Sequence, residues 1–120
     1  MPEPKPSELK YYERPDGKKP FGEWYSALIS KDATTAAKVG KYLSRLEQGN
    51  WSNAKILSGG QGVWEMVIDA GPGYRVYFAQ AGNTIVLLLL GGSKKEQQKD
   101  IQRAIELWDE FKERNKEKKK

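Results

Sequence analysis

Residues 62–78, GVWEMVIDAGPGYRVYF, and residues 84–101, TIVLLLLGGSKKEQQKDI, decide the fold of this chain. The first segment alternates apolar and polar side chains on both sides of Gly71-Pro72-Gly73, which predicts a β-hairpin. The second segment begins with a near-continuous apolar run, Thr84–Leu90, which is typical of a central strand buried on both faces. We expect Gly91-Gly92 to end that strand.

The alternation divides the side chains of the hairpin between two faces of the sheet. The apolar face comprises Trp64, Met66, Ile68, Tyr74, Val76 and Phe78. If this face points to the core, then Glu65, Val67, Arg75 and Tyr77 converge on the opposite face, which we expect to be exposed.

Helical patterns precede the hairpin. Pro20 is well placed to open a helix, and the second helix is predicted from Asp32 to Glu47, with Gly49-Asn50 as its stop signal. The apolar stripes of the two helices are Phe21, Trp24, Tyr25 and Leu28, and Ala36, Val39, Leu43 and Leu46. We expect these helices to form an antiparallel pair, preceded by a short strand at Leu9–Tyr12 and a turn at residues 14–17.

A last helix is predicted after the apolar strand. Residues 93–96, Ser-Lys-Lys-Glu, have the pattern of a capping box. The packed stripe of this helix comprises Ile101, Ala104, Ile105, Trp108 and Phe111. Lys94 and Lys95 are then either solvated residues or part of an anion site beside Arg75. Cations in a first helical turn oppose the helix dipole, which favours a site with an external anion.

The composition excludes several chemistries. The chain has no cysteine and no histidine, which excludes a Ser-His or Cys-His nucleophile pair and a thiolate or imidazole metal site. The chain also lacks a cofactor loop of the usual glycine spacing. Cationic chemistry on an anionic substrate remains, or binding alone, and we expect neither a cofactor nor a metal.

With 120 residues the chain is expected to form one domain, residues 1–111, followed by a basic, solvated tail, residues 112–120. The tail holds six Lys/Arg and two Glu, so residues 1–111 carry a net charge of only about +1 of the total +5. Nucleic-acid binding therefore has to rest on a local cluster of cations. No apolar run is long enough to span a bilayer and no secretion signal is evident, so we expect a cytoplasmic protein and no membrane partner.

Three blocks of the sequence carry a resemblance to a known family. They are YYERPDGKKPFGEWYSAL (residues 11–28), GVWEM with GPGYRVYF (62–66 and 71–78), and LLLLGGSKKEQQKDIQRA (87–104). In this order they resemble the RelE/ParE superfamily of toxins from type II toxin–antitoxin modules, in particular the HigB-like, phage-derived addiction module killer branch. The resemblance implies a compact, RelE-like α+β fold, with an N-terminal helical hairpin on a twisted, mainly antiparallel sheet and a C-terminal helix.

The same resemblance implies an endoribonuclease of the mRNA interferase type, which enters the ribosomal A site and cuts the bound message. The ribose 2′-oxygen attacks the adjacent phosphate and yields a 2′,3′-cyclic phosphate, so no metal is required. A cognate helix-turn-helix antitoxin is the implied protein partner, and mRNA on the ribosome the implied substrate.

The candidate catalytic residues follow from this match. Arg75 corresponds to the arginine of the family's GYR block, and a guanidinium can hold two phosphate oxygens. Lys94 and Lys95 correspond to the basic pair after the Gly-Gly element, where they can bind phosphate or neutralise the leaving oxygen. Tyr77 can stack on a base or donate a hydrogen bond.

Two further residues complete the set. Lys55, expected in a loop before the hairpin, is a candidate for RNA binding together with Arg75 and Lys94. Glu65 is either the general base or a structural ion-pair partner of Arg75.

One residue departs from the family pattern. Relatives usually carry an arginine where this chain has Val67, beside Glu65 and Arg75 on the same face. We therefore expect weakened cleavage, because losing one placed charge can cost several kcal/mol of transition-state stabilisation. Two alternatives stay open, namely a ParE-like, non-catalytic inhibitor of DNA gyrase and an inactive, antitoxin-binding corepressor.

Overall fold

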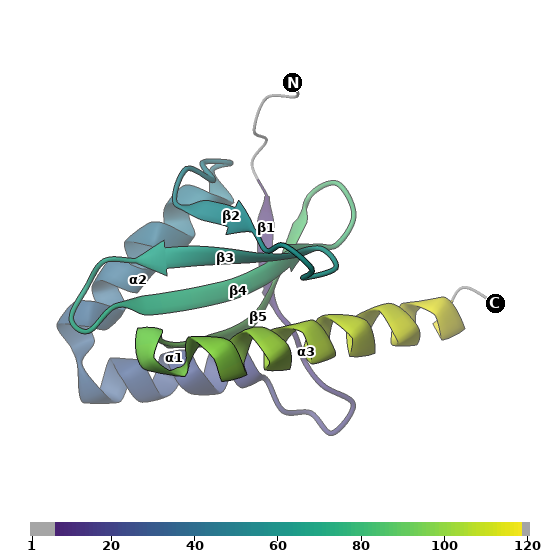
Figure 1. The fold of residues 1–120 in the computed structure, drawn as a ribbon, viewed down its shortest axis with the longest axis horizontal. Helices are drawn as coiled ribbons and strands as arrows, with labels where there is room; N and C mark the ends of the chain where they lie inside the picture. Colours follow the sequence, from purple (N-terminus) through teal and green to yellow (C-terminus); the bar gives the residue numbers. More distant parts are fainter. Residues whose placement is uncertain (1–6, 119–120) are drawn as a thin grey trace.

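The computed structural model describes residues 7–118. The elements follow in the order β1 (Glu8–Tyr11), α1 (Pro20–Lys31), α2 (Ala33–Glu47), β2 (Ala54–Ile56), β3 (Val63–Ile68), β4 (Tyr74–Gln80), β5 (Ile85–Ser93), the 3-10 turn η1 (Lys94–Glu96) and α3 (Gln97–Lys118). The strands form one sheet in the order β1-β5-β4-β3-β2, in which β1 runs parallel to β5 and all other pairs are antiparallel. This arrangement confirms the predicted α+β fold (Figure 1).

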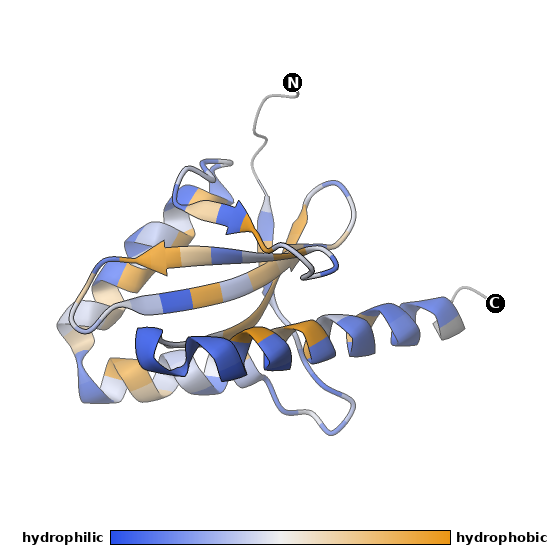
Figure 2. Ribbon diagram, in the orientation of Figure 1, coloured by the Kyte–Doolittle hydropathy of each residue, from blue (hydrophilic) through white to orange (hydrophobic). Residues whose placement is uncertain are grey.

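The helices cover both faces of the sheet. The α1–α2 hairpin packs on one face, where the apolar side chains of the β3–β4 hairpin meet Phe21, Val39 and Leu46. Helix α3 crosses the opposite face, and its apolar residues are confined to the middle of its length (Figures 1 and 2). There Ala104, Leu107 and Trp108 pack against the strands.

This coverage corrects one prediction. The face that carries Glu65, Val67, Arg75 and Tyr77 is not an exposed face, because α3 lies across it. Glu65 is 1% exposed and Tyr77 is 0% exposed, whereas Val67 keeps 38% of its surface accessible. Alternation along a strand identifies which residues share a face, but not what covers that face.

Strand β5 is longer than predicted. It continues through Gly91 and Gly92 to Ser93, so the two glycines do not end it. Both are required by close packing: a Cβ atom at Gly91 would overlap the ring of Trp24, and one at Gly92 would overlap the carboxylate of Asp100. The glycines therefore let α1 and α3 approach the two faces of one strand.

The start of the last helix also differs from the prediction. Ser93 makes no capping hydrogen bond through its side chain, and residues 94–96 form the 3-10 turn η1 before α3 begins at Gln97. The predicted capping box is therefore wrong. By contrast, Asp32 caps α2, because its carboxylate accepts hydrogen bonds from the backbone N–H and the hydroxyl of Thr35.

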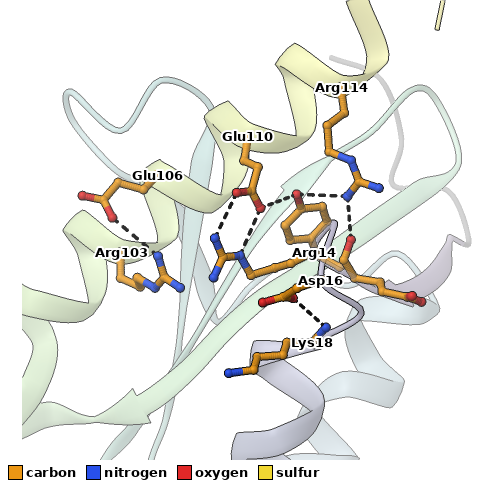
Figure 3. Close-up of polar contacts among 9 residues, drawn as sticks. Arg14, Asp16, Lys18, Arg103, Glu106, Glu110 and Arg114 are labelled. Atoms are coloured by element: carbon orange, nitrogen blue, oxygen red, sulfur yellow. Dashed lines mark hydrogen bonds and ion pairs between the residues drawn. The ribbon is translucent and has the colours of Figure 1, made fainter. Parts of the chain in front are cut away.

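The C-terminal half of α3 is bound to the segment that links β1 to α1 (Figure 3). The Tyr12 hydroxyl donates to Glu110 (2.7 Å), and Arg14 forms two hydrogen bonds with the same carboxylate (3.2 and 3.1 Å). Arg114 donates to the Tyr12 hydroxyl and to the carbonyl oxygen of Glu13. These contacts fix the direction in which α3 crosses the sheet.

The predicted boundary between residues 111 and 112 stays a prediction. Within the described residues α3 runs across it without a break, and Arg114, from the expected tail, contacts the body of the domain. Over residues 7–118, no helix combines the length and the apolar character needed to cross a membrane.

Candidate active site

The candidate site lies where β4 begins and β5 ends, under the first turn of α3. The pairing register places Glu65 opposite Tyr77 and Val67 opposite Arg75, with Gly92 as the next neighbour of Arg75. Directly paired residues share a face of the sheet, so the predicted convergence of these side chains is confirmed.

Glu65 is at the centre of this arrangement. Its Oε2 atom accepts a hydrogen bond from Gln97 Nε2 (2.8 Å) and lies 3.6 Å from Arg75 Nε. Its Oε1 atom lies 3.9 Å from Lys55 Nζ. Because the carboxylate is almost fully buried, these cations offset part of the cost of removing its charge from water.

Three buried polar atoms in this region have no hydrogen-bond partner among the described residues: Glu65 Oε1, Arg75 Nε and the Tyr77 hydroxyl. Buried polar groups in native proteins are nearly always hydrogen-bonded, so a concentration of unpaired groups at one place calls for an explanation. Sites that bind or transform a ligand are one common explanation.

The chemistry of the Tyr77 hydroxyl suits a hydrogen-bond donor and not a base. Burial, and after it the negative charge of Glu65, raises the pKa of Tyr77 far above its usual value. The hydroxyl therefore stays protonated at neutral pH. Because the ring is 0% exposed, it offers no face to a nucleobase, and the predicted stacking role does not fit this geometry.

The structure adds Asp100, which the sequence analysis missed. Its carboxylate occupies the space next to the Cα atom of Gly92, on the face that carries Arg75. Burial, and after it the negative charge of Glu96, raises the pKa of Asp100. A carboxylate with a raised pKa is a better proton acceptor than an ordinary one.

Gln97 was also missed. The three-residue spacing of Gln97 and Asp100 places both on one side of α3, and this spacing was the signal that could have found them. Together, Glu65, Arg75, Tyr77, Gln97 and Asp100 are called the Glu65–Arg75 cluster below.

The predicted lysines surround this cluster in different ways. Lys94, in η1, lies beside the β3–β4 turn, and its backbone N–H donates to the carbonyl oxygen of Gly73. A Cβ atom on Gly73 would contact both Lys94 and Arg75 Nη1, so these two side chains lie on the same side of the turn. Lys55 is not in a loop as predicted, because it lies on β2 opposite Glu65, with its side chain 69% exposed. Lys95 is exposed and lines a cavity between α1 and α3.

Within the part of the chain that the structure describes, no group of three or more His, Cys, Asp or Glu side chains has the arrangement of a metal site. The cluster consists of one guanidinium, two carboxylates, a phenol and an amide, and ammonium groups flank it.

Comparison with known proteins shows the family of the chain. Residues 26–112 match the phage-derived protein Gp49-like family (DUF891). The chain belongs to this Gp49-like family. The family belongs to the addiction-module killer/RelE-like toxin group and is associated with endoribonuclease-type toxins that have an antitoxin partner. The chain is also 40% identical over 84 residues to an uncharacterized protein of Haemophilus influenzae, covering 70% of this chain and 81% of that protein.

The matched span of the Gp49-like family contains the whole Glu65–Arg75 cluster and the three flanking lysines. Membership in this family indicates that the chain is the toxin of a toxin–antitoxin module. The HigB-like assignment, and each residue's role in it, stay predictions.

Proposed function

We propose that this Gp49-like protein is a ribosome-dependent mRNA interferase of the HigB-like kind, acting in the cytoplasm and neutralised by a helix-turn-helix antitoxin. The observation that carries the proposal is the ion pair of Arg75 with the buried Glu65, in a cluster where three buried polar atoms have no hydrogen-bond partner among the described residues. A group of this composition suits attack of a ribose 2′-hydroxyl on the neighbouring phosphate.

Arg75 is the proposed phosphate ligand. Glu65 faces its Nε atom, while Nη1 lies near the exposed β3–β4 turn at Gly73. With 13% of its side chain exposed, Arg75 is held in place and still accessible from the surface. Two N–H groups of one guanidinium can bind two non-bridging phosphate oxygens as negative charge develops.

Two carboxylates compete for the role of proton acceptor. Glu65 is 1% exposed and already bonded to Gln97, so we assign it to orienting Arg75. Asp100 is partly accessible and has a raised pKa, so we assign to it the proton of the attacking 2′-hydroxyl.

The remaining step concerns the leaving group. As the 2′-oxygen forms its bond to phosphorus, the bond from phosphorus to the 5′-oxygen breaks, and that oxygen takes up a proton from water. Lys94 and Lys95 are exposed at η1 and supply the countercharge for it. The products are a 2′,3′-cyclic phosphate and a 5′-hydroxyl.

The test uses programmed ribosomes carrying two versions of one message. The first is all-ribose, and the second has a single 2′-deoxynucleotide immediately 5′ of the cleaved phosphate. The proposal predicts cleavage of the first message and none of the second at that phosphate. Equal cleavage of both messages would refute attack by the 2′-oxygen, because the deoxynucleotide lacks the attacking group.

A further inference from the structure

A cavity of about 520 Å³ adjoins the Glu65–Arg75 cluster. Its lining residues come from α1, the last residues of β5, the β3–β4 turn and the η1–α3 junction. Strand β1 pairs with β5 only as far as Leu88, so the cavity lies beyond the end of β1. Its volume falls within the range of pockets that hold small ligands.

The lining of the cavity combines flat apolar surface with charged groups. Trp24 and Tyr74 supply the aromatic surface, with ring centroids 6.1 Å apart and an angle of 59° between the rings. Gly91 and Gly92 also line the cavity, where the absence of their side chains lets Trp24 and Asp100 lie directly against the backbone of β5. A planar aromatic ligand suits this surface, because stacking on aromatic side chains is how proteins hold unpaired nucleobases.

The charged groups of the cavity complement the phosphate and the base of a nucleotide. Lys31 and Lys95 are cations that suit a phosphate backbone. Glu96 is an exposed carboxylate and accepts hydrogen bonds only, so it suits the exocyclic amino group of a base.

Asp100 connects the cavity to the cluster. Its carboxylate lines the cavity and also lies against Gly92, next to Arg75. A nucleotide whose base occupies the cavity therefore has its ribose near the carboxylate that we assigned to the 2′-hydroxyl.

We propose that this cavity is a nucleoside subsite: it holds the base of the nucleotide whose 2′-hydroxyl attacks, and it favours bases with an exocyclic amino group over uracil. The inference rests on the proposed RNA cleavage for the identity of that nucleotide. It specifies a base preference that the cleavage proposal alone does not contain.

The experiment measures binding without cleavage. Uncleavable trinucleotides with a 2′-deoxy first residue, GUU, AUU, CUU and UUU, are titrated into 15N-labelled protein and followed by NMR. We expect the indole N–H of Trp24 and the amides of Gly91 and Gly92 to shift, with UUU binding at least tenfold more weakly than the other three. Shifts confined to other residues, or equal binding of all four trinucleotides, would overturn the proposal.

Two matched variants sharpen the result. Glu96→Gln replaces the acceptor carboxylate and is expected to reduce the preference against UUU to less than threefold. Glu106→Gln makes the same change on the exposed side of α3 outside the cavity, and is expected to leave all four affinities unchanged. An unchanged preference in the Glu96→Gln protein would also overturn the proposal.

The binding experiment and the cleavage experiment on ribosomes can fail independently. Selective binding without cleavage would retain the subsite and remove the proposed ribonuclease, whereas cleavage without selective binding would do the reverse.

Discussion

At the scale of single residues, the 3.6 Å approach of Arg75 to a carboxylate that is 1% exposed is the most consequential contact in the molecule. A buried ion pair of this kind seldom adds stability over an apolar pair of the same size, because both charges lose their hydration. The pair also lies beside the buried Tyr77 hydroxyl, which has no hydrogen-bond partner among residues 7–118. Binding chemistry therefore explains the pair better than folding does.

Val67 provides a test by gain of function. Val67→Arg places a second guanidinium opposite Arg75, at a position that is 38% exposed and so has room for it. The neighbouring Glu65 Oε1 has no hydrogen-bond partner among the described residues and can offset the repulsion between the two cations. We expect cleavage on ribosomes to become about tenfold faster or more.

Val67→Gln is the matched control for that experiment, because it adds a polar side chain without a charge. It is expected to cleave at the rate of the unmodified protein. If Val67→Arg also cleaved at that rate, the absence of a cation at residue 67 would not be what weakens the site.

Asp100 provides a test through pH. A raised pKa means that Asp100 is protonated, and unable to accept a proton, at higher pH than an ordinary aspartate. The cleavage rate should therefore rise with pH as Asp100 ionises. Asp100→Asn should lower the single-turnover rate by about 10²-fold or more and remove this rise.

Asp100→Glu should retain part of the rate that Asp100→Asn loses. Glu106→Gln, which alters an exposed carboxylate of the same helix, should change neither the cleavage rate nor its dependence on pH. Retention of the full rate and of the pH dependence in Asp100→Asn would assign the proton to another group.

The sequence predicted which residues of the hairpin share a face, because a period of two follows from strand geometry alone. It did not predict Asp100 or the burial of Glu65. Asp100 reaches the site only because Gly92 has no side chain and α3 crosses β5 at that point. Contacts between distant elements of this kind leave no periodic signal in the sequence.

At the scale of secondary-structure elements, the interpretation of Gly91-Gly92 as a stop signal was wrong for a physical reason. Glycine is common after strands, but it is also required inside a strand where another element approaches closely. Similarly, β2 was missed because it is only three residues long, at the edge of the sheet, and its residues 54–56 show too short an alternation to recognise.

Gly91→Ala tests the close approach of α1 to β5. The added methyl group would overlap the ring of Trp24, so we expect the free energy of unfolding to fall by about 2 kcal/mol or more. Ser93→Ala, two residues further along the same strand, should change it by less than about 0.5 kcal/mol. Urea denaturation measures both, and equal stability of the two variants would contradict the predicted overlap.

At the scale of the whole molecule, the contacts of Glu110 with Tyr12 and Arg14 join the segment that follows β1 to the C-terminal half of α3 (Figure 3). The hydrogen bonds from Arg14 lower the pKa of Glu110. The ionised carboxylate therefore stabilises the folded state. This contribution is fully present at pH values above the ordinary carboxyl pKa of about 4.3, and it is lost as the pH falls through the lowered pKa.

Glu110→Gln should therefore unfold more easily than the unmodified protein at pH 7, and the difference should shrink as the pH is lowered below about 4. Denaturation curves at several pH values measure this. A difference that stayed constant down to pH 3 would show that the charge of Glu110 is not what holds α3.

The helical hairpin, the β3–β4 hairpin and the buried strand β5 could be predicted, because they depend on periodicity within single segments. The parallel pairing of β1 with β5 and the placement of α3 over the second face could not, since both depend on contacts across most of the chain. The candidate cluster was therefore predicted in its strand residues and missed in its helix residues.

The measurement that tests the central claim most directly is cleavage of a message on programmed ribosomes, mapped by primer extension, for the unmodified protein and for Arg75→Ala. We predict cuts within the A-site codon that become at least about 100-fold weaker in the variant, while its secondary structure is retained. Cuts of equal strength in both proteins would remove Arg75 from the site. No cuts by either protein, together with inhibition of supercoiling by gyrase, would contradict the ribonuclease and establish the gyrase-binding alternative.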